Sequence, residues 1–374
     1  MMASPMFGRK TLITAACLYA LVICCTIWPS KSDSETTDSS DASTPQLAGL
    51  EGLPYCGCSM QLHDVGNVAG YEKSCDEIAA LGGDSVMFVP SSSMETPEST
   101  RIYMDMRHTL SDADLRTLIR HAKGDGLRVV LMPIVLLDRT EKPNDWRGTI
   151  HPEDDQQDDW DDWFASYQDM ILYYANLAQQ TGVNVLVVGS ELVSSEPFVD
   201  NWRNIIRKIR SVFHGQLTYS SNWDHYMMVD FWDELDMVGM NSYWKLGPDD
   251  DPQVAVSEIK RRWQKIQQDL FAWQAKVKKP ILLLEAGWCS LANASYEPWD
   301  YTRTDLDLDL DLQKRLYEGF FQSWWGQPQC GGFMMWEWTP ESPGGPQDKG
   351  YTPRGKPAAQ VLKDWFAKPR WKVQ

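Results

Sequence analysis

From residue 54 onward, short apolar runs alternate with longer segments whose apolar residues recur at helical spacing. The predicted strands are 55–60, 85–89, 128–135, 184–189, 216–221, 237–241, 281–285 and 332–336. The predicted helices are 70–81, 111–124, 158–181, 199–213, 227–234, 253–276, 307–325 and 356–367. Runs 183–188 and 280–284 are almost entirely apolar, as expected for parallel strands that are buried on both faces. This alternation predicts an α/β fold, a (β/α)8 TIM barrel, as a single catalytic domain over residues 51–374.

A doubly wound nucleotide-binding sheet is the rival fold for such an alternation. It requires a glycine-rich phosphate-binding turn after an early strand, and the sequence contains neither G-x-G-x-x-G nor G-x-x-x-x-G-K. The formal net charge of −17 also repels phosphate backbones, so we expect no nucleic-acid partner. The barrel is therefore the favoured fold.

The first segment is predicted to serve targeting. Arg9 and Lys10 precede the uncharged apolar run 11–28, and a polar Ser/Thr/Asp-rich stretch follows. Residues 1–28 are interpreted as a signal peptide or an N-terminal membrane anchor, and residues 29–50 as a linker. We expect export to the extracytoplasmic side, membrane contact through the N-terminal segment only, and a monomer.

Two glutamates follow directly on buried apolar strands. Glu191 ends the run V-V-G-S-E of the fourth predicted strand, and Glu285 ends L-L-L-E of the seventh. Active sites of TIM barrels form at the carboxyl ends of the strands, and a lone buried charge is costly without a function. Paired carboxylates at a barrel mouth indicate glycoside hydrolysis. The alternative is that each glutamate caps a helix or pairs with an arginine.

Aromatic and amide side chains crowd the same strand ends. The chain has 18 tryptophans, more than a core commonly requires, and flat rings at a cleft can stack on sugar faces. The alternative for one or two of them is burial in the core. The candidate substrate-binding residues are Trp146, Asn222, Trp223, Asn241, Tyr243, Trp244, Trp288, Trp336, Glu337 and Trp338.

Metal ligation has little support in the sequence. Cys56-x-Cys58 is not a zinc-ribbon spacing, and H-E-x-x-H does not occur. The acidic run 305–311 is interpreted as a solvated helix entry, with a calcium tract as the alternative. We therefore expect no metal and no organic cofactor, and a polysaccharide or oligosaccharide substrate.

From about residue 54 to 366 the chain resembles glycoside hydrolase family 113, the β-1,4-mannanases of the retaining TIM-barrel clan. The matching blocks are 146–148 (WRG), 160–178 (WDDWFASYQDMILYYANLA), 188–192 (VGSEL), 202–223, 231–236 (FWDELD), 239–246 (GMNSYWKL), 279–290 (KPILLLEAGWCS), 331–338 and 350–358 (GYTPRGKPA). The resemblance implies Glu191 as acid/base, Glu285 as nucleophile, a contact of Tyr243 with the nucleophile and a floor for the −1 sugar at Trp336. A hydrogen bond from Tyr243 is expected to hold Glu285 ionised, and that charge is expected to raise the pKa of Glu191.

Two positions depart from the pattern of the wider clan. Ser190 stands where an asparagine precedes the acid/base, and Ile134 stands where a histidine is expected after Pro133. The position of Ile134 favours a first alternative, a β-glucan-active hydrolase or a transglycosylase of the same clan. A second alternative is a non-catalytic surface carbohydrate-binding protein on the same scaffold.

Overall fold

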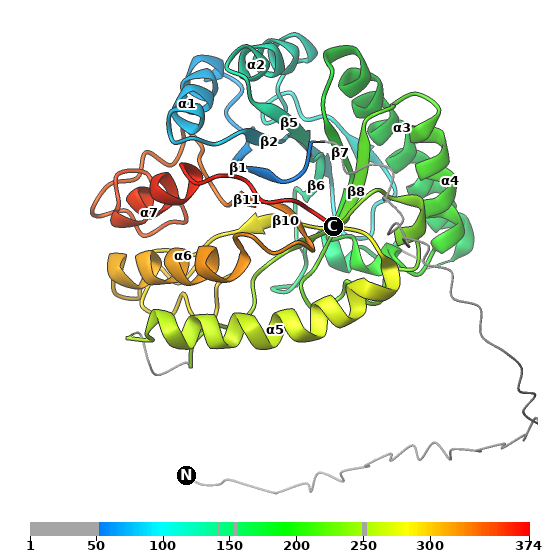
Figure 1. The fold of residues 1–374 in the computed structure, drawn as a ribbon. Coiled ribbons are helices and arrows are strands. Elements are labelled where there is room, and N and C mark those ends of the chain that lie inside the picture. Colours follow the sequence, from blue (N-terminus) through cyan, green and yellow to red (C-terminus); the bar gives the residue numbers. More distant parts are fainter. Residues whose placement is uncertain (1–51, 141, 153–155, 249–252) are drawn as a thin grey trace, which may run out of the picture. The chain divides into compact units, whose positions relative to one another are not determined.

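Eight parallel strands close into a barrel in the order β1-β11-β10-β9-β8-β7-β5-β2 (Figure 1). The structure is a computed structural model, which describes residues 52–140, 142–152, 156–248 and 253–374. The barrel strands are β1 (Tyr55–Gln61), β2 (Ser85–Val89), β5 (Arg128–Leu131), β7 (Val185–Ser190), β8 (Gln216–Ser221), β9 (Val238–Asn241), β10 (Ile281–Ala286) and β11 (Cys330–Met335). The predicted TIM barrel is confirmed.

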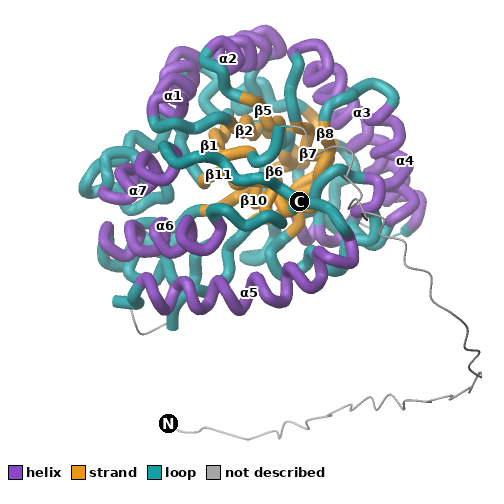
Figure 2. Tube along the Cα trace, in the orientation of Figure 1, coloured by secondary structure: helices purple, strands orange, loops and turns teal. Residues whose placement is uncertain are grey.

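Helices surround the strands on all sides, as the purple ring around the orange barrel shows (Figure 2). They are α1 (Val68–Ala80), α2 (Asp112–Gly124), α3 (Gln157–Thr181), α4 (Val199–Arg210), α5 (Val256–Val277), α6 (Leu310–Trp324) and α7 (Pro357–Phe366). Local signals set several boundaries: Ser111 caps α2 through the Asp114 N–H, and Pro357 occupies the first turn of α7.

The helix predicted over 227–234 is wrong. Only a short 3-10 helix, η3 (Trp232–Glu234), lies between β8 and β9. The buried apolar residues Val229 and Phe231 are two positions apart, which does not match helical spacing. The Trp232 indole N–H also donates to the Tyr226 carbonyl at 2.9 Å, which stabilises a turn in place of a helix.

The third predicted strand, 128–135, is two strands. β5 ends at Leu131, and β6 (Ile134–Leu137) begins after Pro133, which has no backbone N–H to donate. β6 joins β3 (Ser91–Met94) and β4 (Ile102–Tyr103) in a separate three-stranded sheet. This small sheet therefore extends the chain beyond the carboxyl ends of β2 and β5.

Alternation along the strands produces two cores. In β7, Val185 and Val187 belong to the cluster inside the barrel, whereas Leu186 and Val188 belong to the larger cluster under the helices. Five tryptophans are completely buried: Trp163, Trp202, Trp263, Trp288 and Trp324. Packing therefore accounts for more of the tryptophans than the one or two expected from the sequence.

The C-terminal tail covers the amino ends of the strands. Trp371 donates its indole N–H to the Cys330 carbonyl at 2.9 Å, and Arg370 pairs with Asp84 at 2.7 Å, just before β2. Figure 1 shows this red tail crossing the barrel. The amino end is thereby closed, and the opposite end carries the residues predicted to be functional.

The segments 1–28 and 29–50 lie outside the described residues, so the predicted signal or anchor, linker and export stay predictions. Within the described residues, no helix is both long and apolar enough to cross a bilayer. The cysteines of the described part, Cys56, Cys58, Cys75, Cys289 and Cys330, are buried and free.

Candidate active site

Glu191 follows directly on β7 and is held in a left-handed backbone conformation. Its φ is 56°, a region that non-glycine residues rarely occupy and that clusters at functional sites. Its N–H donates to the Ser220 carbonyl at the end of β8, at 2.8 Å. The residue is 8% exposed. The backbone therefore fixes a nearly buried carboxylate at the carboxyl end of the barrel.

Glu285 is turned into the barrel mouth by an irregularity near the end of β10. Leu282 and Leu284 face the interior of the barrel, and strict alternation would place Ala286 there as well. Ala286 instead belongs to the outer cluster, and the register of β10 shifts against β9 between Leu283 and Glu285. Such an irregularity re-aims a side chain, here Glu285, which is 4% exposed.

Both carboxyl groups have specific partners. Arg147, in the 3-10 helix η1 (Arg147–Thr149), lies with its Nη2 2.5 Å from Oε2 of Glu191. Asn241, the last residue of β9, donates from Nδ2 to Oε1 of Glu191. Tyr243 donates its hydroxyl to Oε2 of Glu285 at 2.8 Å, which confirms the predicted contact. Oε1 of Glu285 is buried and has no hydrogen-bond partner among the described residues.

The surroundings of Glu285 do not match the expectation that the Tyr243 hydrogen bond holds this carboxyl group ionised. Burial raises the pKa of Glu285, and the neighbouring Glu191 charge raises it further, against the lowering effects of Arg147 and the Tyr243 hydrogen bond. The hydrogen bond alone therefore does not hold Glu285 ionised. Burial therefore opposes the ionised form of Glu285, and Arg147 and Tyr243 are the contacts that favour it.

Several predicted substrate-binding residues gather at this mouth. Asn241 also accepts the Trp223 N–H at 2.9 Å, and Trp223 packs edge-on against Trp244 at 5.9 Å. Oδ1 of Asn222 is buried without a hydrogen-bond partner in the described part of the chain. Trp336 is half-buried and contacts both the interior cluster and the cluster around Tyr243.

The structure places two candidates away from the mouth, in the layer between the strands and the helices. Trp288 is fully buried and packs against Tyr317 and Phe320 of α6, at 5.6 and 5.7 Å. Trp338 is 4% exposed and donates its indole N–H to Glu77 of α1 at 2.9 Å. Each ring fills the layer between strand and helix, where burial of a large apolar surface stabilises the fold.

The other candidates occupy intermediate positions. Glu337 is half-buried, accepts from Nε2 of Gln61 at 2.9 Å, and has its pKa raised by burial. Its charge also acts on Glu285, so it is a third carboxyl group near the pair. Trp146 is half-buried and immediately precedes Arg147, with its N–H bonded to Oγ1 of Thr149 at 3.0 Å.

Two residues at the site were missed by reading strand ends alone. Arg147 lies in a loop helix, far from any predicted strand end, although its block W-R-G was among those that carry the resemblance. Tyr351 is 8% exposed and packs against Tyr243 at 6.3 Å. No strand precedes it closely, and only the tertiary fold brings it to the mouth.

A third buried glutamate, Glu196, supports the backbone next to Glu191. The Tyr219 hydroxyl donates to Glu196 at 2.9 Å and accepts the Leu192 N–H at 3.0 Å. Burial raises the pKa of Glu196 from 4.5 to about 7. Its folded-state pKa is above the unfolded value, so its contribution to stability is greatest at low pH and is lost as pH rises through about 7.

We therefore expect Glu196→Gln to unfold like the wild type at pH 4 but to be more stable at pH 8, by about 1–3 kcal/mol. The amide oxygen can still accept from Tyr219. Urea unfolding at both pH values measures the difference. Glu258 is the matched control: Arg261 and Arg262 lower its pKa, so Glu258→Gln should bring no gain at pH 8. An equal effect of Glu196→Gln at both pH values would contradict the prediction.

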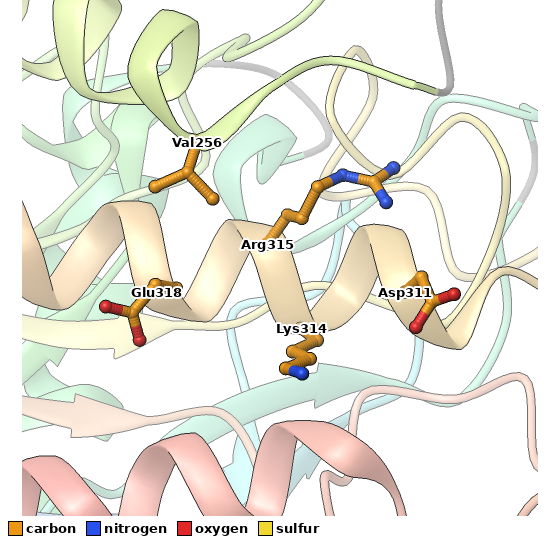
Figure 3. Close-up of a pocket in the computed structure, with 5 residues that line it drawn as sticks. All are labelled: Val256, Asp311, Lys314, Arg315 and Glu318. Carbon is orange, nitrogen blue, oxygen red and sulfur yellow. The ribbon is translucent and has the colours of Figure 1, made fainter.

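A pocket and an acidic cluster among the described residues lie outside the barrel. Figure 3 shows a pocket between α5 and α6 that contains none of the predicted site residues; it is lined by Val256, Asp311, Lys314, Arg315 and Glu318. A group of Asp76, His121 and Asp125, on α1 and at the end of α2, has ligand atoms close enough to hold a metal ion. His121 there pairs with both carboxylates, at 2.8 and 3.3 Å, so an ion-pair network accounts for the cluster.

Comparison with known proteins agrees with this geometry. The family model of glycoside hydrolase family 113 matches residues 67–356. A GH113 β-mannanase from Alicyclobacillus acidocaldarius, solved in complex with ManMIm, is 28% identical, with a TM-score of 0.74 over 86% of this chain and 99% of that chain. A second solved GH113 β-1,4-mannanase is 25% identical, with a TM-score of 0.74 over 85% of this chain and 100% of that chain.

A family 5 mannosidase from Rhizomucor miehei shares the fold, with a TM-score of 0.59 at 13% identity over 85% of this chain and 94% of that chain. Comparison with curated proteins gave no match. The family match spans most of the barrel and contains both strand-end glutamates. The chain therefore belongs to glycoside hydrolase family 113 and is a glycoside hydrolase that resembles endo-β-1,4-mannanases.

Proposed function

We propose that the protein hydrolyses a β-1,4-linked polysaccharide, β-mannan above all, with retention of the anomeric configuration. The observation that carries the proposal concerns Oε1 of Glu285, which has no hydrogen-bond partner in the described part of the chain and lies in the electrostatic range of Glu191 at the barrel mouth. A buried carboxylate oxygen without a hydrogen-bond donor keeps its lone pairs for a reacting carbon. The two relatives described as β-mannanases support the choice of mannan.

Glu285 is the proposed nucleophile. It attacks the anomeric carbon and forms a covalent glycosyl-enzyme, while Glu191 gives its proton to the leaving glycosidic oxygen. After the first product leaves, Glu191 acts as general base and takes a proton from a water molecule. The water attacks the anomeric carbon, and the bond from that carbon to Glu285 breaks. This division requires Glu285 to be ionised, the state that Arg147 and the Tyr243 hydrogen bond favour. Retention predicts about 5–5.5 Å between the two carboxyl groups, against about 6.5–9.5 Å for inversion.

The neighbouring side chains have roles that follow from their contacts. Tyr243 fixes the orientation of Glu285 through Oε2, which leaves Oε1 for attack. Asn241 orients Glu191 in the same way. Arg147 favours the ionised state of Glu285, since its charge lowers the pKa of that carboxyl group. The half-buried Trp336 is the proposed floor for the sugar that undergoes attack.

The substrate is tested with reducing-sugar release by the purified protein from linear β-1,4-mannan, glucomannan and β-1,4-glucan. We expect the highest kcat/KM on mannan, with the Glu285→Ala variant as the blank. A preference for β-glucan would support the alternative that rests on Ile134, which lies in the barrel interior and offers no polar group to the sugar. Products longer than the substrate would indicate transglycosylation instead. Binding without turnover on every glycan would support a carbohydrate-binding protein.

A further inference from the structure

The apolar side chains that the described residues expose are concentrated at one end of the barrel. The large ones are Met104, Met106, Met227, Met228, Trp299 and Tyr301. Each lies in a segment that follows the carboxyl end of a barrel strand: the first two lie between β2 and α2, the next two follow β8, and the aromatic pair follows β10. In a TIM barrel these segments build the active-site face. Exposed apolar side chains on that face indicate a binding surface.

Trp299 is connected to the acid/base candidate by direct contacts. Asn241 donates to Glu191 and accepts the Trp223 N–H. The ring of Trp223 then stacks on Trp299, with centroids 6.2 Å apart and planes 17° apart. Trp299 is 39% exposed, so this series leads from the buried carboxylate to solvent.

Tyr301 is connected to the nucleophile candidate by a second series. Tyr243 donates to Glu285 and packs against Tyr351 at 6.3 Å. Tyr351 in turn packs against Tyr301 at 6.4 Å. Tyr301 is 65% exposed, more than a ring needs to be if it served only to cover Tyr351. Both series thus end two residues apart in the segment between β10 and α6.

This segment is held in place by contacts outside itself. The Tyr351 hydroxyl donates to the Pro298 carbonyl at 2.7 Å, next to Trp299. Lys349 donates to the carbonyls of Thr304 and Leu306, at 2.8 and 2.7 Å. Rings on a fixed segment lose little freedom on binding, which favours affinity.

We propose that Trp299 and Tyr301 form an outer platform that binds a sugar unit of a long β-1,4-linked chain, beyond the units that contact Glu191 and Glu285. The inference rests on the proposed function, since the polysaccharide is the occupant. Its basis is continuity: the same aromatic series that surrounds the two carboxyl groups extends to these exposed rings. A platform beyond the reacting sugar units makes long chains better substrates than short ones, because the binding energy of the remote units also stabilises the transition state.

The test compares β-1,4-mannohexaose with mannotriose as substrates. In the wild type we expect a higher kcat/KM on the hexasaccharide. In the double variant Trp299→Ala/Tyr301→Ala, the ratio of the two values should fall by about tenfold, as loss of apolar contact on two rings predicts. Tyr301→Phe keeps the ring face and should keep the ratio. Tyr173→Ala, on α3 beside α2 and away from the barrel mouth, is the matched control, with no change of ratio. An unchanged ratio in the double variant overturns the platform.

A binding measurement separates this inference from the proposed function. The Glu285→Ala protein is run through native gels that contain soluble galactomannan, glucomannan or β-glucan. We expect retardation that decreases when Trp299 and Tyr301 are also replaced by alanine. If the wild type hydrolyses none of these glycans, the proposed function fails, yet reduced retardation still supports the platform. Equal retardation with and without the two rings, or no retardation in any gel, overturns it.

Discussion

Glu285→Ala is expected to lower kcat on β-mannan by at least about 10⁴-fold, because Glu285 is the group proposed to form the covalent intermediate. The fold should persist. Burial raises the pKa of Glu285 from 4.5 to about 8, so the stability that this group contributes is lost as pH rises from about 4.5 through 8, and its removal should not lower the unfolding temperature at pH 8. The kcat of Glu285→Ala is measured by a discontinuous assay, and its unfolding temperature is measured on the same preparation.

Sodium azide sharpens this experiment. In Glu285→Ala a small anion can take the place of the lost carboxylate, and a single displacement then gives a product of inverted configuration. Glu318→Gln is the matched control, since Glu318 lies in the outer pocket between α5 and α6. It removes one negative charge far from the mouth and should leave kcat unchanged. Wild-type-like turnover by Glu285→Ala would exclude it as the nucleophile.

Glu191→Ala should show a different pattern, because its role is proton transfer. We expect kcat on polysaccharide to fall by about 10²–10⁴-fold, the usual range for loss of a general acid/base. A dinitrophenyl glycoside, whose leaving group requires no proton, should form the glycosyl-enzyme at a rate close to that of the wild type. The pH profile of kcat/KM should lose its alkaline limb, since that limb reports the group that must be protonated.

In Glu191→Ala, azide should attack the accumulated glycosyl-enzyme and give a product of retained configuration. This is the opposite of the result expected for Glu285→Ala. Glu191→Gln is the informative companion, since the amide can still contact Asn241 and fill the site. It should be as slow as Glu191→Ala on polysaccharide. If the dinitrophenyl substrate slows as much as mannan does in both variants, Glu191 has no role as the acid.

The pattern at the predicted strand ends gives the positions of Glu191 and Glu285, but it does not determine which way their side chains point. The apolar runs before Glu191 and Glu285 predict buried strands, and the end of each run gives the position. Whether the side chain faces the barrel or the helices depends on alternation. In β10 the alternation changes after Leu284, at a shift in register that no sequence periodicity indicates.

The sequence also does not show which strand-end tryptophans face the barrel mouth and which are buried under helices. Trp288 and Trp338 follow strand ends as closely as Trp223 and Trp336 do, yet the first two are buried under helices. A ring at a strand end has two available environments, and its contacts with α6 or α1 decide between them. Composition alone could not separate packing from binding.

The sequence by itself determined the (β/α)8 fold, the family and the position of both glutamates, because periodicity, strand ends and ordered blocks are local properties of the chain. Only the tertiary structure decided how Glu285 is aimed, that Arg147 pairs with Glu191, and that Trp299 and Tyr301 end the two aromatic series. These features join residues far apart in the chain. Closure of the barrel brings them together, and the local pattern around each of them carries no information about its partner.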